Sequence, residues 1–444
     1  MFTKIHFKIE LLFSYTKKHF FLVLAAIALI TLSIIFKNQI ISFYRSPIWH
    51  PKIIGLQGLY TLDTLPSDIS QQISYGLTIS SDTNKPIPSP LVKSIDIQNN
   101  NKDYIFTLND NIFWSNGKKF TAHDINYQIP GLEIDIISNY QVKISTQEQF
   151  SPILSVLSKP IFKKNLVGLG EYQVKKITYQ EGYLKSISLT PKDKTKNSIE
   201  YRFYYNENDV IDAYKIGNVN EIRISSLPTE FTKWNKTKIS QKIETNQKYI
   251  AIFLNTQKIA NKQTRQALAY ATPKVKDKNE RCLGPISPTS WAYNSTVKEY
   301  NFSSIRAKEL FEKNKIDKIN LSINNRELLP LAENIKNNWQ DILKIETSIT
   351  IENQIDLQNF DAILTYGAIP NDPDQYSFWH STQTNTNITK LNNSRIDKLL
   401  EEGRQTIDQL ERKKIYQDFQ RYLLEESPAI FLYYPTTYTI TRSI

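Results

Sequence analysis

The sequence has 444 residues but a single cysteine, Cys282, and only five histidines. One thiol cannot form an intramolecular disulfide or a cysteine-based metal cluster. No HExxH, Cys-x-x-Cys, phosphate loop or nucleophile elbow is present, although His123 and His380 leave open a ligand or acid–base role. A solvated helix start and a packed loop are the simpler interpretations of these two. We therefore expect no enzyme activity, no catalytic thiol, no metal and no cofactor.

Long runs of one charge are also missing, although 55 Lys and Arg residues against 44 Asp and Glu residues give a formal charge of +11. The basic residues are scattered, which favours a solvated surface over a nucleic-acid partner. Glycine is scarce, at 12 residues, but 40% of the residues are hydrophobic and 12% are aromatic. A chain of this length and composition can build two lobes with sizeable cores.

One long uncharged run is present, from Phe20 to Phe36. As a helix it would span about 26 Å, near the lower limit for crossing a membrane. A cleaved secretory signal is the alternative, but no small-x-small cleavage site and no lipid-accepting cysteine follow. We predict a cytoplasmic tail over 1–18, a signal anchor over 19–37 and a linker over 38–50. The protein would be single-pass in the cytoplasmic membrane, with its globular part on the extracytoplasmic side.

Residues 104–124 read YIFTLNDNIFWSNGKKFTAHD. Alternating apolar residues from Tyr104 to Leu108 predict a strand with one buried face, and 112–114 predict a second strand. Asn and Gly at 116 and 117 favour a turn. Thr121 and Asp124 have the spacing of a capping box, which predicts a helix that ends before the Pro-Gly pair at 130 and 131.

This order of elements resembles the YTFTLRDGVKWHDGKPFTAEDV signature of the family 5 extracellular solute-binding proteins. These are the oligopeptide- and dipeptide-binding components of bacterial ABC importers. Further strings resemble the family in the same order along the chain: YGL at 75–77, VGLGEYQV at 167–174, RQALAYA at 265–271, GPISPTSWAYN at 284–294, NDPDQYSFWHS at 371–381 and AIFLYYP at 429–435.

The resemblance implies an α/β fold, a two-lobed clamshell like the periplasmic binding proteins, of type II and family 5 architecture. It would be trimmed, because the family usually carries a longer helical insertion after Pro130. Lobe one would take residues 51–248 and 427–444, and lobe two 249–426, with the crossings as the hinge. The implied function is capture of peptides or peptide-like solutes by lobe closure and their delivery to an ABC permease. The alternative is a degenerate member that serves as a surface sensor or assembly partner.

Seven side chains are candidates for ligand contact: Asp372, Asp374, Tyr376, Trp379, Tyr75, Trp114 and Trp291. Aromatic rings supply contact area at low entropic cost, and a carboxylate can hold an amino group. Each has a structural alternative, a turn for the aspartates and a core position for the tryptophans. Peptide binders of the family commonly carry an Asp shortly before this Asp-Pro, whereas residues 368–371 are Ala-Ile-Pro-Asn. That departure counts against recognition of a free peptide N-terminus.

Overall fold

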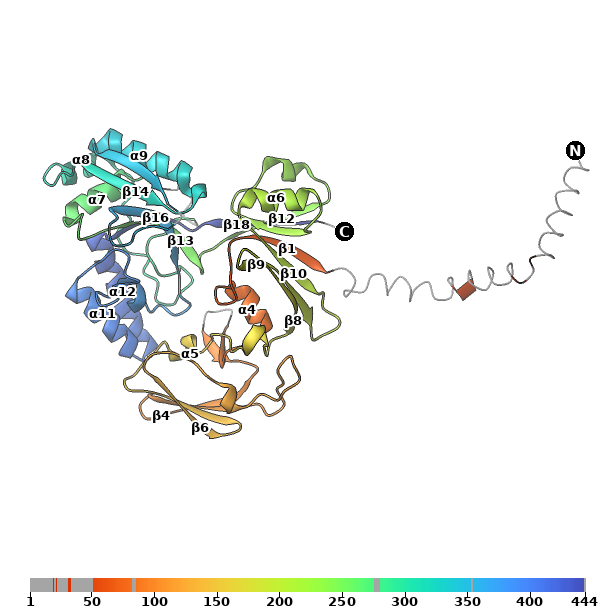
Figure 1. The fold of residues 1–444 in the computed structure, drawn as a ribbon. Helices are drawn as coiled ribbons and strands as arrows, with labels where there is room; N and C mark the ends of the chain where they lie inside the picture. Colours follow the sequence, from red (N-terminus) through yellow and green to blue (C-terminus); the bar gives the residue numbers. More distant parts are fainter. Residues whose placement is uncertain are drawn as a thin grey trace, which may run out of the picture.

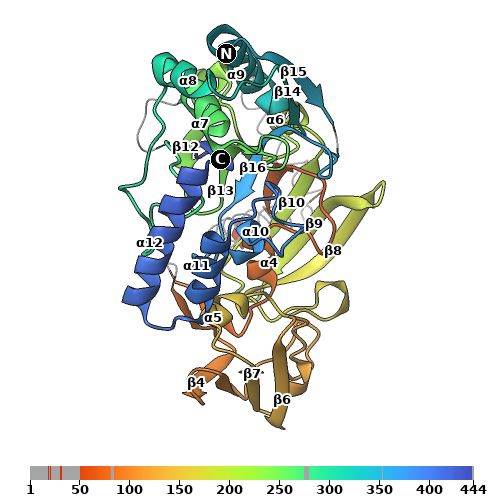
Figure 2. The ribbon, with the colours of Figure 1, turned by 90° about the vertical axis from the view of Figure 1, so that its left-hand side faces the viewer.

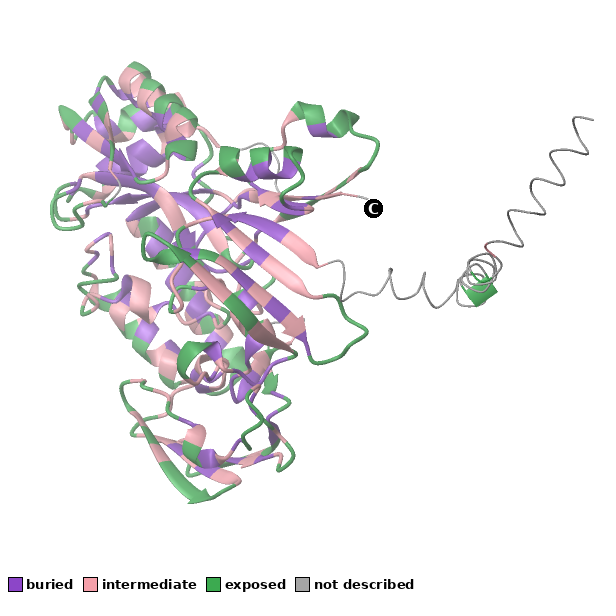
Figure 3. Ribbon diagram, turned by 45° about the vertical axis from the view of Figure 1, so that its right-hand side comes forward, coloured by how far each residue is buried: buried purple, intermediate pink, exposed green. Residues whose placement is uncertain are grey.

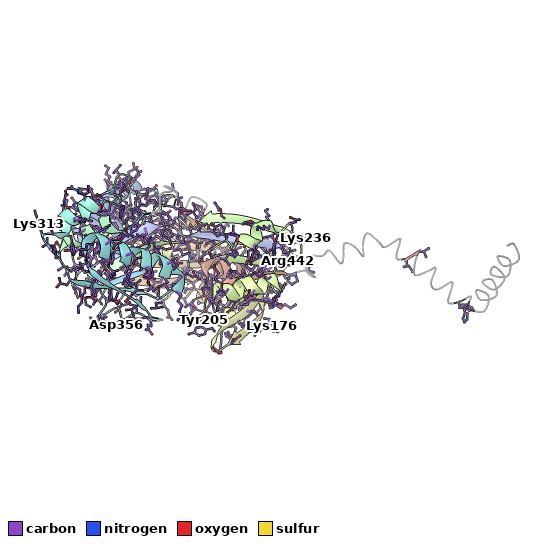
Figure 4. The ribbon with its side chains drawn as sticks, turned by 90° about the horizontal axis from the view of Figure 1, so that it is seen from above. Lys176, Tyr205, Lys236, Lys313, Asp356 and Arg442 are labelled. Atoms are coloured by element: carbon purple, nitrogen blue, oxygen red, sulfur yellow. The ribbon has the colours of Figure 1, made fainter. Side chains whose placement is uncertain are left out.

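The computed structural model describes residues 19, 21, 31, 32, 51–81, 85–274, 280–352 and 354–442. These form a mixed α/β structure built on a seven-stranded, a five-stranded and a four-stranded sheet, with one additional two-stranded hairpin (Figure 1). Buried residues follow the central strands, and exposed residues lie on the outer helices and loops (Figure 3). Seen from above, Lys313 and Asp356 project from the part with the five-stranded sheet, whereas Lys176, Lys236 and Arg442 project from the part with the seven-stranded sheet (Figure 4).

The seven-stranded sheet has, in spatial order, β12 (Thr237–Ile243), β18 (Thr436–Arg442), β11 (Glu221–Ile224), β1 (Lys52–Gln57), β10 (Ile199–Tyr204), β9 (Tyr183–Pro191) and β8 (Tyr172–Gln180). β1 runs parallel to β10 and β11, and the other pairs are antiparallel. The helix α6 (Glu207–Lys215) packs on one face and α4 (Ser67–Ile73) on the other. Because successive residues point to opposite faces, β1 and β10 contribute to both cores, as with Ile53 and Ile54 of β1.

The four-stranded sheet has the order β4 (Val92–Gln98), β5 (Asp103–Leu108), β7 (Gln141–Thr146) and β6 (Leu132–Ser138). Its core contains Phe106, Trp114 and Phe120, and it lies at the bottom of Figure 2. Nearby are β2 (Thr78–Ser80), β3 (Pro86–Pro88), α5 (Ile153–Val156) and the 3-10 turns η1 (Ala122–Asp124) and η2 (Lys164–Leu166). A further 3-10 turn, η3 (Thr229–Lys233), precedes β12.

The five-stranded sheet has the order β15 (Glu346–Ile351), β14 (Lys318–Ile323), β16 (Ala362–Ala368), β13 (Lys248–Leu254) and β17 (Ala429–Tyr433). One face is covered by α7 (Lys262–Ala271), α8 (Ser304–Phe311) and α9 (Leu329–Leu343), which follows the 3-10 turn η4 (Arg326–Leu328). The other is covered by α10 (Tyr376–Trp379), α11 (Ser394–Gln405) and α12 (Gln409–Glu426). β13 is buried on both faces, as its continuous apolar run predicts.

Two local predictions are corrected. Residues 112–114 form only an isolated β-bridge, Phe113 to Lys119, because no neighbouring strand extends the pairing. The helix expected from Thr121 is a single 3-10 turn with the predicted capping box, and Ile125 is already extended. α11 is capped by Asn393, whose side chain accepts from two backbone amides of the first turn.

The chain changes sheet between residues 243 and 248 and again between residues 433 and 436. β17, which the sequence analysis assigned to lobe one, pairs with β13 in the five-stranded sheet. The second change of sheet therefore comes later along the chain than residue 427. The lobe boundaries as a whole stay a prediction.

The predicted localisation, single-pass in the cytoplasmic membrane, is corrected. Among the described residues no helix is both long and apolar enough to cross a membrane. The longest described helix, α12, has 18 residues and is rich in Glu, Lys and Arg, whereas a span needs about 20 mainly apolar residues. The predicted tail, the linker and all of the predicted anchor except residues 19, 21, 31 and 32 lie outside the described residues.

Candidate solute-binding cavity

A cavity of about 860 Å³ lies between the seven-stranded sheet and the five-stranded sheet. One wall is the face of β12, β18, β11 and β1, and the opposite wall includes Tyr366 of β16 together with Asn325 and Glu327 of the η4 region. Gln247 and Lys248 line it where the chain crosses between the sheets. Its volume is within the range of about 300–1,000 Å³ that is usual for small-molecule sites.

The strand sequences make this wall polar. Thr437, Thr439 and Thr441 of β18 line the cavity, whereas Ile440 packs under α6 on the other face. In β12, Lys238, Ser240 and Lys242 alternate in the same way. The period-two pattern of these strands thus separates an apolar core face from a hydrogen-bonding cavity face.

The charges that line the cavity balance, with five basic and five acidic side chains. Lys52 Nζ lies 2.8 Å from Glu221, and Arg223 Nη1 lies 2.6 Å from Asp68. Within the described residues, Glu207 and Glu327 have no ion-pair partner, and both line the cavity. The cavity is therefore suited to a solute that carries both charges.

Both of these unpaired carboxylates act on Tyr366, which also lines the cavity. Burial raises the pKa of Tyr366, and the negative charges of Glu327 and Glu207 raise it further. Glu207 accepts from the Ser225 amide at 2.6 Å, which fixes its carboxylate at the start of α6. The Lys248 ammonium lies 4.9 Å from the centroid of the Tyr366 ring. An amino or guanidinium group of a solute would be stabilised here by carboxylates from both walls.

None of the seven side chains predicted from the sequence is among the described residues that line this cavity. Asp372 accepts from Arg412 Nη1 at 2.9 Å, and Asp374 accepts from Arg404 Nε at 3.0 Å. Burial raises the pKa of Asp374, while Arg404 lowers it. Both carboxylates are thus engaged within the protein.

The predicted tryptophans lie largely in cores. Trp379 is 2% exposed and stacks on Phe253. Trp114 is also 2% exposed, and its indole N–H donates to Asp124 at 3.1 Å. Trp291 is half-buried, with the Arg412 guanidinium 5.5 Å from its ring. These positions fit the structural alternative, and a ligand role for them stays a prediction.

Tyr376 and Tyr75 are both half-buried. Tyr376 is sandwiched between His380, at 4.0 Å between ring centroids, and the Arg404 guanidinium at 3.9 Å. The Arg404 guanidinium also lies 5.3 Å from the Phe150 ring. Tyr75 packs beside the core of the four-stranded sheet. Their roles as ligand contacts likewise stay predictions.

The end of α11 joins the two predicted lobes. The Ser151 amide donates to the Arg404 carbonyl at 2.8 Å, and the Ser151 hydroxyl donates to the Gly403 carbonyl at 3.2 Å. Figures 1 and 2 both place this end of α11 beside α5. The two predicted lobes are therefore also in contact at the end of α11, away from residues 243–248 and 433–436, where the chain crosses between the sheets.

Of the remaining chemical candidates from the sequence, His123 is exposed, whereas His380 and Cys282 are packed groups. His380 is 3% exposed, with Nε2 3.1 Å from Glu401 and Nδ1 2.8 Å from Thr382. Cys282 is fully buried, and burial raises the pKa of its thiol to about 11. Such a thiol is un-ionised near neutral pH, as expected of a packing residue.

Comparison with known proteins decides the family. The family model described as "Bacterial extracellular solute-binding proteins, family 5 Middle" matches residues 86–390, more than half of the chain. The chain belongs to this family. The match confirms the resemblance seen in the sequence and identifies the chain as a solute-binding protein. The family is described as extracellular, and this description replaces the predicted single-pass location in the cytoplasmic membrane.

Individual relatives are distant but extensive. The oligopeptide-binding protein AppA of Bacillus subtilis is 19% identical, over 86% of this chain and 84% of its own. The probable D,D-dipeptide-binding periplasmic protein DdpA of Escherichia coli is 20% identical, over 78% and 79%. Among solved structures, NikZ from Campylobacter jejuni in complex with Ni(L-His) has a TM-score of 0.76 at 21% identity, covering 88% of this chain and 94% of its own. AppA with a nonapeptide has a TM-score of 0.74 at 19% identity, covering 88% and 95%. These structures show the same fold.

Proposed function

We propose that this solute-binding protein captures peptides or peptide-like solutes in the 860 Å³ cavity and delivers them to an ABC permease. The observation that carries the proposal is the balanced set of lining charges, with unpaired carboxylates on both walls. A peptide carries an ammonium at one end and a carboxylate at the other, and such a ligand can satisfy both kinds of group. Relatives whose names specify oligopeptides and dipeptides support the choice of solute.

Lobe closure is the proposed capture mechanism, in a clamshell of type II whose lobes follow the predicted boundaries except that β17 goes with the five-stranded sheet. The two segments that change sheet, 243–248 and 433–436, are short and adjacent to the cavity. Closure of this kind needs only a few residues to absorb the change in backbone dihedrals. A solute bridging Glu207 and Glu327 would hold the two walls together, because each carboxylate belongs to a different wall.

Native mass spectrometry of the gently purified full chain tests the binding half. We expect bound peptides of defined length, which are released on denaturation. Added peptide mixtures at about a hundredfold above Kd stabilise the fold by roughly 2.7 kcal/mol. A protein that is empty and gains no thermal stability from such mixtures contradicts the proposal.

Two matched variants locate the site. Glu327→Gln removes a lining carboxylate without an ion-pair partner, and we expect peptide affinity to fall about tenfold or more, as for a lost charge-assisted hydrogen bond. Glu333→Gln changes an exposed carboxylate on α9 that does not line the cavity. Equal affinity of the two variants would place the solute elsewhere.

Delivery is tested separately. Cross-linking in cells followed by purification should recover ABC permease subunits with this protein. Recovery of a partner without transport function, and of no permease, would favour the degenerate sensor or assembly protein instead.

A further inference from the structure

The end of α11 receives a helix cap from the other predicted lobe. The last four carbonyl groups of a helix have no partner within that helix. Gly403 and Arg404 lie in the last turn of α11, which ends at Gln405. The Ser151 hydroxyl donates to the Gly403 carbonyl at 3.2 Å, and the Ser151 amide donates to the Arg404 carbonyl at 2.8 Å. Ser151 precedes α5, so the cap comes from the part of the chain with the four-stranded sheet (Figure 2).

The Arg404 side chain completes this contact. Its guanidinium lies 5.3 Å from the centroid of the Phe150 ring in one predicted lobe and 3.9 Å from that of the Tyr376 ring in the other. A cation over the face of an aromatic ring is attracted to it. The Arg404 Nε donates to Asp374 Oδ2 at 3.0 Å, which fixes the orientation of the guanidinium. Asp374, from the Asp-Pro-Asp motif seen in the sequence, thus orients the group that meets Phe150.

The groups on the α11 side of this contact keep partners of their own when the lobes separate. Arg404 keeps its bond to Asp374, and the Gly403 carbonyl still accepts from Arg412 Nε at 2.8 Å. Ser151 and Arg404 are half-buried, so water can replace the two hydrogen bonds between the lobes. Separation leaves the guanidinium paired, and the contact is therefore one that can break and form again at low cost.

We propose that Phe150, Ser151, Gly403 and Arg404 form a releasable clasp, which holds the two predicted lobes together and opens when they separate. Asp374 acts on the clasp through Arg404, as a positioning residue. The chain itself joins the lobes at residues 243–248 and 433–436, and the clasp joins them at a second place. Rotation about the crossings displaces distant points most, so loss of the clasp should allow wider lobe separation. The clasp goes beyond the proposed function, because it acts on the lobes without any solute.

Double electron–electron resonance on the full chain measures the lobe separation in the absence of solute. Spin labels are attached to Glu133→Cys on β6 and Lys414→Cys on α12, since both positions are exposed. The native thiol of Cys282 is fully buried, so the label does not react with it. We expect a main short distance from clasped lobes and a minor longer distance from open lobes. A distribution without the short distance overturns the proposal.

A serine pair tests the cap. Ser151→Ala removes one hydrogen bond of the clasp, and we expect the ratio of open to clasped lobes to rise about two- to tenfold. Ser158→Ala is the matched control, because the Ser158 hydroxyl donates to the Ser155 carbonyl at 2.6 Å within one lobe. That control should leave the distances unchanged. Equal distributions for the two alanine variants contradict the clasp.

An arginine pair on α11 tests the side-chain contact. Arg404→Gln removes the cation that meets Phe150, and the ratio of open to clasped lobes should rise at least as much as in Ser151→Ala. Arg395→Gln is the control, since the Arg395 guanidinium lies 3.6 Å from the centroid of the Tyr422 ring within one lobe. Circular dichroism checks that each variant is folded. A folded Arg404→Gln variant with unchanged distances refutes the role of Arg404.

The positioning role of Asp374 has a separate readout. Asp374→Asn and Ser151→Ala both act on the same helix end, so the double variant should raise the open-to-clasped ratio by less than the product of the two single effects. A ratio equal to that product would show that Asp374 does not act on the clasp. Because no peptide is present, this experiment can fail while peptide binding holds, and the reverse.

Discussion

The pair formed by Asp372 and Arg412 yields a prediction that separates a structural role from a binding role. Arg412 is 5% exposed, and Asp372 Oδ2 lies 2.9 Å from its Nη1, with a second contact between Nη2 and Oδ1. The Arg412 Nε also donates to the Gly403 carbonyl at 2.8 Å. Asp372→Asn removes the charge while keeping the shape, and leaves a buried guanidinium without a counterion.

The magnitude follows from the burial of the two partners. Removing one partner of a buried pair costs about 3–5 kcal/mol of unfolding free energy. The Asp372 side chain is 14% exposed, and asparagine keeps one oxygen acceptor, so we expect a loss of about 2–4 kcal/mol. Most of this loss is the cost of an uncompensated charge. The double variant Arg412→Met, Asp372→Asn should therefore lose less unfolding free energy than the sum of the losses of the two single variants.

Urea denaturation of the full chain, followed by tryptophan fluorescence, measures these losses. The matched control is Asp418→Asn, which breaks the exposed pair that Asp418 forms with Arg421 on α12 and should change stability little. Peptide affinity of the folded Asp372→Asn variant should remain close to that of the unmodified protein. A loss no larger than that of Asp418→Asn, together with a fall in peptide affinity, would refute the structural interpretation and restore Asp372 as a ligand contact.

Three further predictions concern the loops around the cores. Gly168→Ala should lower the unfolding free energy by at least about 3 kcal/mol in urea denaturation, because a Cβ there would collide with the backbone of Ile73. In the control Gly284→Ala the new Cβ meets no atom within 4 Å and stability should not change, so equal effects would contradict the close approach. Trp114→Phe should cost about 1 kcal/mol by the same assay, since it leaves the half-buried Asp124 carboxylate without the indole N–H, and an unchanged midpoint would argue against that bond. Burial raises the folded-state pKa of Asp374 above its ordinary value of 3.8, so its contribution to stability is fully present below about pH 3.8 and is lost as pH rises through the folded-state pKa. The unfolding free energy of the protein relative to that of Asp374→Asn should therefore fall over that pH range, and a constant difference would show that the pKa is unshifted.

Elements with strong local signals could be predicted from the sequence. The continuous apolar run at β13 indicated a strand buried on both faces, and the spacing of Thr121 and Asp124 indicated the capping box. The length of the following helix was wrong, because the extended backbone at Ile125 ends the turn that the cap begins. Local patterns thus located the start of this element better than its extent.

The cavity could not be predicted, because its walls come from strands distant in the sequence. Thr439 of β18 and Ser240 of β12 lie side by side only because the sheet places β18 next to β12. The motif that contains Asp372 and Asp374 was easy to find in the sequence, but the arginine partners of these aspartates could not be predicted, because they lie on later helices. Glu207 and Tyr366 lie at a helix start and near a strand end, yet only the fold shows that they share a cavity.

The position of β18 in the seven-stranded sheet has a consequence for synthesis. β18 lies between β12 and β11, and pairs with both over most of its length. Until the ribosome has passed residue 442, β11 and β12 each expose an unpaired edge, and such edges invite pairing with other chains. The wall of the solute cavity is therefore completed only after β18 has been translated, long after β11 and β12. Folding of this sheet must wait for that strand, and the nascent chain needs protection from aggregation until then.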